Sequence, residues 1–293
     1  MMTTPSRSRM LPAAATLAAA ATAVLTTVAA APPAQAAAYS SYTALGDSYA
    51  AAAGVPTTVD ISCLRSDRDY PSLTAAALKT ATFTDMTCSG ATTADMTQAQ
   101  SGTGNPPQFD GLKTDTSLVT LTIGGNDIGF AGILETCSLL GVADPFGDPC
   151  TDYYTSGGTD QLSQRIRSTA PKVASVIQGI HQRSPHAKVL VVDYLDILPL
   201  HGSCFGDNNT IAPGDYPYLN AKEQQLNQML GSEASANNAT FVDAYADSIG
   251  HDLCKPSGTA WIDGYITDQS APVHPNELGE QAYASAVLAA LGK

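Results

Sequence analysis

Residues 42–49 read YTALGDSY, and the interpretation of the whole chain begins with this stretch. A short apolar, strand-like run ends at Gly46, where glycine permits a tight turn that a side chain would block. In open α/β sheets, ligands bind beyond the carboxyl ends of the strands. The turn therefore places the hydroxyl of Ser48 at a ligand-binding edge, which makes Ser48 a candidate nucleophile. The alternative is an ordinary turn in which the serine only caps a helix.

The first 36 residues have the pattern of a secretory signal peptide. Arg7 and Arg9 make a basic start, an alanine-rich apolar run follows, and small residues precede the expected cleavage site after Ala36. We expect residues 37–293 to form a single secreted, extracellular domain with no integral membrane segment. A chain of this length can bury a sizeable core.

The composition is acidic, with 27 acidic and 14 basic residues and a formal net charge of −13. Without the two leader arginines, the remaining 12 basic and 27 acidic residues leave a charge of −15. This balance argues against nucleic acid as a partner and against electrostatic binding to anionic membranes. We expect a monomer.

Six cysteines in an exported chain predict three disulfides. The sequence alone does not choose among the pairings, and the simplest is sequential: Cys63 with Cys88, Cys137 with Cys150, and Cys204 with Cys254. Because there is no Cys-x-x-Cys and the histidines are scattered, a structural zinc site is not expected.

Strand-like and helix-like runs alternate after residue 40, which predicts a parallel sheet with helices on both faces. Strands are expected at 41–45, 82–87, 117–123, 187–193 and 240–243. Helices are expected at 71–80, 160–182, 218–230 and 276–291, the second of them interrupted near Pro171. Residues 128–140 form an apolar segment, 147–150 a turn, and 102–115 and 199–217 loops.

Three of the predicted strands end in residues suited to catalysis. Ser48 follows the first strand, Gly90 the second and Asn126 the third. Because the carboxyl ends of parallel strands share one edge of a sheet, these residues can converge there. Ester hydrolysis needs a nucleophile, a base and donors for the developing oxyanion. The backbone amides of Ser48 and Gly90 and the side-chain amide of Asn126 are candidate donors.

The candidate base is His274, which lies in the segment APVHPN directly before the last predicted helix. The following proline, Pro275, restricts the histidine backbone to an extended conformation. The other histidines are interpreted as solvated or structural: His181, His186, His201 and His251.

Taken together, these segments occur in the order and contexts of the four sequence blocks of the SGNH (GDSL-type) hydrolases. The blocks are Gly46-Asp47-Ser48, Gly90, Gly124-Gly125-Asn126-Asp127 and His274-Pro275. The chain resembles the secreted actinomycete esterases, lipases and phospholipases A1 of that family. The resemblance implies a flavodoxin-like, three-layer α/β/α sandwich with a central parallel sheet.

By the same resemblance, Ser48 is the nucleophile, Gly90 and Asn126 complete the oxyanion hole with Ser48, and His274 is the general base and acid. No metal or cofactor is implied. Many members carry an aspartate where Ala271 stands here. We therefore predict a Ser48–His274 dyad in which a backbone carbonyl of Ala271 or Pro272 orients the imidazole. The alternative partner is Asp268.

Three positions within or next to these sequence blocks are not assigned a catalytic role. Tyr49 stands where the family name has leucine, and we expect this difference to be tolerated. Asp47 and Asp127 are expected to anchor turns by accepting backbone hydrogen bonds.

The implied function is hydrolysis of fatty-acyl lipid esters through an acyl-enzyme, by a lipase or esterase with phospholipase A1 activity among the possibilities. The apolar segment after Asn126 either forms an acyl groove or packs on the core; its members are Ile128, Phe130, Ile133, Leu134, Leu139 and Leu140. Alternatives are a carbohydrate acetylesterase on the same scaffold and a secreted, non-catalytic binding protein. A lipase with Gly-x-Ser-x-Gly is disfavoured because Ala50 occupies the second glycine position.

Overall fold

The structure is a computed structural model and describes residues 1–4, 39–206, 208–267 and 269–293. Almost all of the predicted signal peptide, and the alternative partner Asp268, lie outside the described residues. Within the described part of the chain, no helix has both the length and the apolar character needed to cross a lipid bilayer.

The strands are β1 Ser41–Gly46, β2 Thr58–Asp60, β3 Arg65–Ser66, β4 Thr82–Asp85, β5 Leu118–Thr122, β6 Lys188–Val192 and β7 Thr240–Val242. The α-helices are α1 Tyr70–Leu78, α2 Phe130–Ala143, α3 Pro149–Thr155, α4 Gln161–Arg183, α5 Tyr216–Ala236, α6 Tyr245–Ser248 and α7 Glu277–Ala290. Short 3₁₀ turns are η1 Thr93–Met96, η2 Gln108–Gly111, η3 Ser156–Gly158 and η4 Pro213–Asp215.

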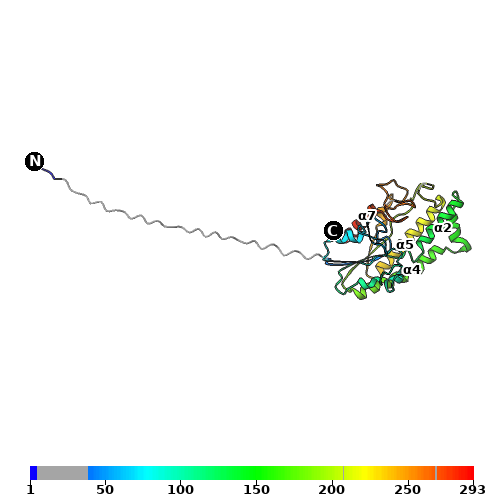
Figure 1. Cartoon of the computed structure of the whole chain (residues 1–293), viewed down its shortest axis with the longest axis horizontal. Helices are drawn as coiled ribbons and strands as arrows, with labels where there is room; N and C mark the ends of the chain where they lie inside the picture. Colours follow the sequence, from blue (N-terminus) through cyan, green and yellow to red (C-terminus); the bar gives the residue numbers. More distant parts are fainter. Residues whose placement is uncertain (5–38, 207, 268) are drawn as a thin grey trace. The chain divides into compact units, whose positions relative to one another are not determined.

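The central sheet has five parallel strands in the order β4-β1-β5-β6-β7. Leaving aside the small β2–β3 hairpin, this is the 2-1-3-4-5 order of flavodoxin-like folds. Right-handed crossovers put α1 on one face and α4 and α5 on the other, and α7 packs beside α1 (Figure 1). The predicted three-layer fold class is confirmed.

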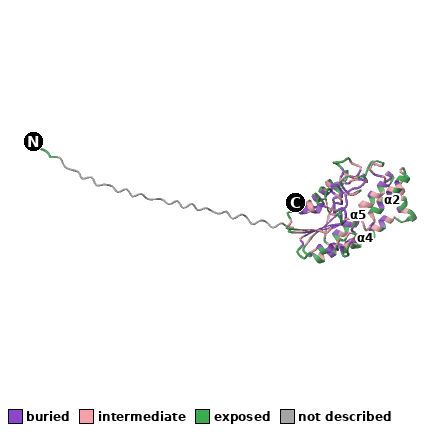
Figure 2. Cartoon of the chain, viewed as in Figure 1, coloured by how far each residue is buried: buried purple, intermediate pink, exposed green. Residues whose placement is uncertain are grey.

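Both faces of the sheet are covered, which explains the composition of its strands. Every residue of β5 is buried, and the middle of the fold is buried throughout (Figure 2). A parallel strand that is covered on both faces reads as a continuous apolar or β-branched run rather than an alternating one. The continuous apolar and β-branched runs of β5 and β6 therefore allowed both strands to be predicted from the sequence.

The expected interruption of the long helix near Pro171 is wrong, because α4 runs unbroken from Gln161 to Arg183 with Pro171 inside it. A proline removes one helical hydrogen bond. Here the helix also buries a long apolar face, including Ile166, Val173 and Ile177. That packing outweighs the local cost of the proline.

Several elements differ from the sequence-based expectation. The β2–β3 hairpin was not anticipated, and the expected turn at 147–150 leads into α3. Helix α5 starts earlier and ends later than predicted, at Tyr216 and Ala236. The disulfides of the structure follow the sequential pairing: Cys63–Cys88, Cys137–Cys150 and Cys204–Cys254. The second of them joins α2 to α3.

Candidate active site

The turn after β1 holds Ser48 at the carboxyl edge of the sheet. A side chain at Gly46 would come within 2.6 Å of the Thr122 carbonyl oxygen on β5, so the turn requires glycine. The side chain of Gln108 holds the same glycine on both sides, accepting from its amide at 2.8 Å and donating to its carbonyl at 2.9 Å. Since β1 lies between β4 and β5, Ser48 sits where the strand order reverses, which is the usual ligand site of such sheets.

Ser48 and His274 are 226 residues apart in sequence and are in direct contact. The distance between Ser48 Oγ and His274 Nε2 is 2.7 Å. His274 Nδ1 lies 2.7 Å from the carbonyl oxygen of Pro272. A carbonyl can only accept a hydrogen bond, so Nδ1 carries the proton and Nε2 accepts from the serine hydroxyl. Burial lowers the pKa of His274, and the Pro272 hydrogen bond opposes this in part.

The loop before α7 is held in place by hydrogen bonds from residues outside the four sequence blocks, and this restrains His274. Val273 has a positive φ of 57°, which is an unfavourable conformation for a β-branched residue. The hydroxyl of Tyr49 donates to the Val273 carbonyl oxygen at 2.9 Å and braces this turn. Asn276 caps α7 by accepting from two helix amides, and its side chain also donates to Asp263 at 3.1 Å.

The candidate oxyanion donors lie on the three neighbouring strand ends, as expected from their order. Among the described residues, neither the Ser48 amide nor the Gly90 amide donates to another backbone group. Gly90 has a positive φ of 79°, which favours glycine. The Asn126 side chain donates one of its two N–H groups to the Ala91 carbonyl oxygen at 2.9 Å, which leaves the other available.

Two aspartates fix these loops, as predicted. Asp127 accepts from the amide of Thr93 at 2.9 Å and from its hydroxyl at 2.6 Å, which ties the Gly90 loop to the Asn126 loop. Asp47 accepts from the Tyr49 amide at 3.0 Å within its own turn.

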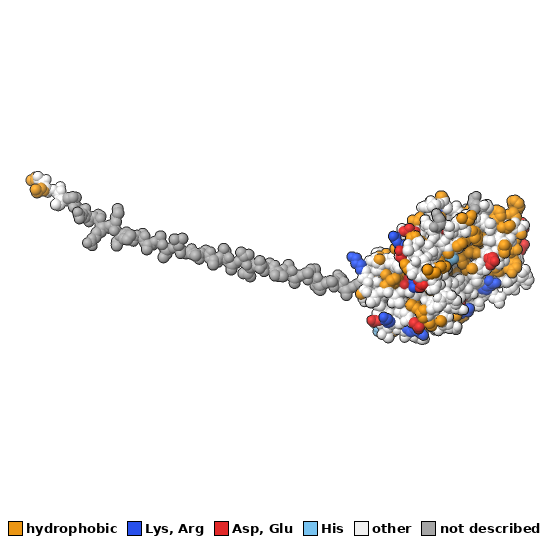
Figure 3. All heavy atoms as spheres, viewed as in Figure 1, with side chains coloured by type: hydrophobic (Ala, Val, Ile, Leu, Met, Phe, Trp, Pro, Cys, Tyr) orange, Lys and Arg blue, Asp and Glu red, His pale blue; other side chains and the backbone are white. Residues whose placement is uncertain are grey.

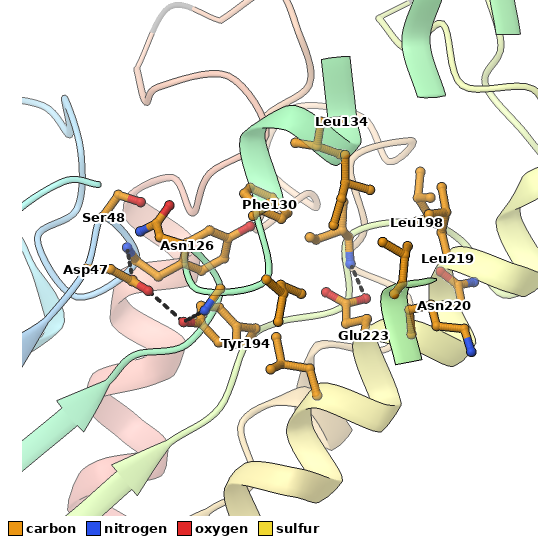
Figure 4. Close-up of a pocket in the computed structure, with 18 residues that line it drawn as sticks. Asp47, Ser48, Asn126, Phe130, Leu134, Tyr194, Leu198, Leu219, Asn220 and Glu223 are labelled. Atoms are coloured by element: carbon orange, nitrogen blue, oxygen red, sulfur yellow. Dashed lines mark hydrogen bonds between the residues drawn. The ribbon is translucent and has the colours of Figure 1, made fainter. Parts of the chain in front are cut away.

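A network through Tyr194, which the sequence analysis missed, joins two of the loops. Its hydroxyl donates to Asp47 Oδ2 at 2.6 Å and accepts from the Gly125 amide at 2.8 Å (Figure 4). Burial raises the pKa of Asp47 to about 7, against the lowering effect of the Tyr194 hydrogen bond. Tyr194 comes two residues after β6, so its position at the same sheet edge was the signal that could have revealed it.

Two cavities meet at Ser48. One is an apolar pocket running from Ser48 toward Leu198, Leu219 and Asn220 (Figure 4). The other is an open groove bordered by Gly90, His274 and Tyr265.

Four of the six residues predicted for an acyl groove line the apolar pocket: Ile128, Phe130, Ile133 and Leu134. Leu139 lines the open groove, and Leu140 borders neither of these two cavities.

The remaining described histidines lie away from Ser48. His251 stacks on Trp261 with ring centroids 4.1 Å apart, and His181 contacts the Asn237 carbonyl oxygen at 3.1 Å. No cluster of three potential metal ligands occurs among the described residues.

A three-layer α/β/α fold with a histidine-bonded serine at its switch point is typical of a class of serine hydrolases. Comparison with known proteins gives the family. A profile of the GDSL-like lipase/acylhydrolase family matches residues 44–282, and the chain belongs to this family. It is a lipase/esterase, a hydrolase of carboxylic esters. The predicted family is therefore confirmed.

Curated relatives and solved structures agree. The chain is 40% identical over 265 residues to Lipase 2 of Streptomyces coelicolor, which covers 88% of each protein. The structure of phospholipase A1 from Streptomyces albidoflavus matches with a TM-score of 0.70 and 30% identity, covering 87% of this chain and 98% of that one. An extracellular lipase from Streptomyces rimosus matches with a TM-score of 0.72 and 28% identity, covering 86% and 99%.

Proposed function

We propose that this chain is a secreted serine hydrolase that cleaves ester bonds of fatty-acyl lipids, phospholipids included, through a Ser48–His274 dyad. The observation that carries the proposal is the 2.7 Å contact of Ser48 Oγ with His274 Nε2, with Ser48 lining an apolar pocket. Nucleophile, base and acyl site are thus contiguous.

In the proposed reaction, His274 Nε2 takes the hydroxyl proton as Ser48 Oγ attacks the ester carbonyl carbon. The imidazolium then gives this proton to the departing alcohol, which leaves an acyl-serine. Water attacks the acyl-serine with His274 again as base, and the fatty acid leaves. The Pro272 carbonyl takes the place of an acidic third residue by holding the Nδ1 proton, at 2.7 Å.

The oxyanion that forms at each stage is stabilised by the amides of Ser48 and Gly90 and by the free N–H of Asn126. Asp127 and Tyr194 keep these loops in register through the hydrogen bonds described above. Loss of one oxyanion donor typically lowers kcat about 10²–10³-fold.

The surroundings of the site favour lipids over acetylated sugars. The apolar pocket extends from Ser48 to Leu198 and Leu219, so a two-carbon acetyl group would contact only its Ser48 end. Apolar side chains are also exposed around the open groove and beyond it along α2 (Figure 3). They lie on three segments: Ile61 and Leu64, Leu139 to Phe146, and Ile266. Exposed apolar patches of this kind are typical of surfaces that contact lipids or other proteins.

Secretion is supported by the signal-peptide pattern of residues 1–36 and by three disulfides, which persist in oxidising compartments. Similarity to an extracellular lipase also supports secretion.

The experiment is a substrate panel of p-nitrophenyl esters of increasing chain length, a dispersed phospholipid and acetylated xylan. It compares the wild type with Ser48→Ala and with Ser285→Ala, an exposed serine on α7 that serves as control. We expect the wild type and the control to hydrolyse long-chain esters and phospholipid, and Ser48→Ala to be inactive. Turnover by Ser48→Ala would overturn the mechanism, and a preference for acetylated xylan would overturn the substrate class.

A further inference from the structure

Beyond the Asp47–Ser48 turn, one acidic side chain interrupts the apolar wall of this pocket. Glu223, on α5, lies between the Ser48 end and the far end marked by Leu198 and Leu219 (Figure 4). Helix α5 also contributes Leu226 to the same wall. A carboxyl group among aliphatic side chains is unusual because burying it without partners is unfavourable.

The hydrogen bonds of Glu223 are incomplete. Its Oε2 accepts from the Ile197 amide at 3.3 Å, and its Oε1 is buried without a hydrogen-bond partner among the described residues. The adjacent cation, Lys222, is bound to Asp160 and Ser163 at 2.5 and 2.7 Å. Glu223 therefore faces the pocket without a salt bridge in the described part of the chain.

A second polar group lies one helical turn away. Asn220 lines the same pocket and is 5% exposed. Its Nδ2 donates to the Pro199 carbonyl oxygen at 3.3 Å, and its Oδ1 has no partner among the described residues. Residues three apart share one face of a helix, so Asn220 and Glu223 form one polar spot in the pocket.

The charge state of this spot restricts what it can bind. Burial, together with the nearby Asp196, raises the pKa of Glu223 well above its ordinary value, which favours the neutral carboxylic acid over the carboxylate. A neutral carboxyl group both donates and accepts, and the Asn220 oxygen accepts. A hydroxyl group has the matching pair of functions and, being uncharged, enters an apolar pocket at lower desolvation cost than an ion.

We propose that Glu223 and Asn220 form a subsite for a hydroxyl group on the acyl chain, so that the preferred substrates are esters of hydroxylated fatty acids. The proposal rests on the acyl pocket proposed above and specifies its occupant. The chain would run from Ser48 along Phe130 and Leu134, and its hydroxyl would pair with Glu223.

The test uses p-nitrophenyl dodecanoate and a set of isomers that carry one hydroxyl group at successive positions of the chain. It compares the wild type with Glu223→Leu, Glu223→Gln and Gln228→Leu, the last an exposed control on α5. For the wild type and the control, we expect one position, or two adjacent ones, to raise kcat/KM about tenfold over the unsubstituted ester. Glu223→Leu should lose this preference, so that the hydroxylated and unsubstituted esters are hydrolysed with similar kcat/KM. Glu223→Gln should retain part of it, since an amide still donates and accepts.

A wild-type profile without a preferred hydroxyl position would overturn the subsite, as would a preference that survives in Glu223→Leu. If Glu223→Leu does not fold, Glu223→Gln decides: a smaller preference than that of the wild type supports the subsite, and an unchanged preference overturns it. Failure of the proposed mechanism is a distinct result, because Ser48→Ala, assayed in parallel, would then retain activity on the unsubstituted ester.

Discussion

Tyr194→Phe is the most informative substitution because one hydroxyl group joins the nucleophile turn to an oxyanion loop. It donates to Asp47 at 2.6 Å and accepts from Gly125 at 2.8 Å, next to Ser48 and Asn126 respectively. The aromatic ring, packed edge-on to Tyr49 with centroids 5.1 Å apart, remains in the variant. The substitution therefore removes the two hydrogen bonds and little packing.

The expected loss of stability follows from the two groups left behind. Asp47 is 1% exposed, and a buried polar group without its partner costs about 1–3 kcal/mol. Asp47 can take up a proton and avoid a buried unpaired charge, since its pKa is already about 7. We expect the free energy of unfolding to fall by about 2–4 kcal/mol. Urea unfolding monitored by circular dichroism measures this.

The expected loss of activity comes from displacement of the two loops. Small misplacements of reacting groups lower rates by up to about 10²-fold, so we expect kcat to fall about 10–100-fold with little change in KM. Tyr42→Phe is the matched control, because its buried hydroxyl bonds only Thr120, at 2.7 Å, far along β1 from the turn. It should lose about 1 kcal/mol of stability and retain kcat. If Tyr194→Phe loses stability but keeps wild-type kcat, the network does not position the catalytic groups.

Three further outcomes are expected. Because burial lowers the pKa of His274, the acid limb of kcat/KM should have its midpoint below 6.5, and a midpoint above 6.5 would contradict the burial effect. Tyr49→Phe removes the hydrogen bond to the Val273 carbonyl oxygen, so we expect kcat to fall several-fold and the free energy of unfolding to fall by about 1 kcal/mol. Unchanged kinetics would show that the loop before α7 does not need this hydrogen bond to position His274. Burial raises the pKa of Asp47 to about 7 and of Asp193 to about 8, so the folded state holds protons that the unfolded chain releases above about pH 4. Thermal unfolding should therefore show stability falling between about pH 4 and pH 8, and a rise over this window would refute the assignment.

Much of the fold was predictable because its signals are local. The β-branched run ending at Ile123 favours a strand that is buried on both faces. The proline and asparagine before α7 mark the start of a helix. The failure at Pro171 has the opposite origin, since a local rule yielded to packing of the α4 face on its neighbours. The hairpin β2–β3 was missed because its strands are only three and two residues long.

The residues of the candidate site likewise fall into those that local sequence patterns predict and those that only the tertiary structure reveals. Ser48, Gly90, Asn126 and His274 could be named because each lies in a short motif with its own turn chemistry. Tyr49 was judged a tolerated difference, yet it braces the histidine loop, a contact across 224 residues that no local pattern encodes.

By itself, the sequence determined the order of strands and helices, the glycine turn before Ser48 and the family to which the chain belongs. Those properties follow from residue spacing and backbone preferences that act over a few positions. Only the tertiary structure decided that the carbonyl of Pro272, and not that of Ala271, holds His274, that Tyr194 joins two loops, and that Glu223 lines the pocket. The physical reason is that buried polar partners are set by the packing of the whole sheet, which brings distant segments together at one edge.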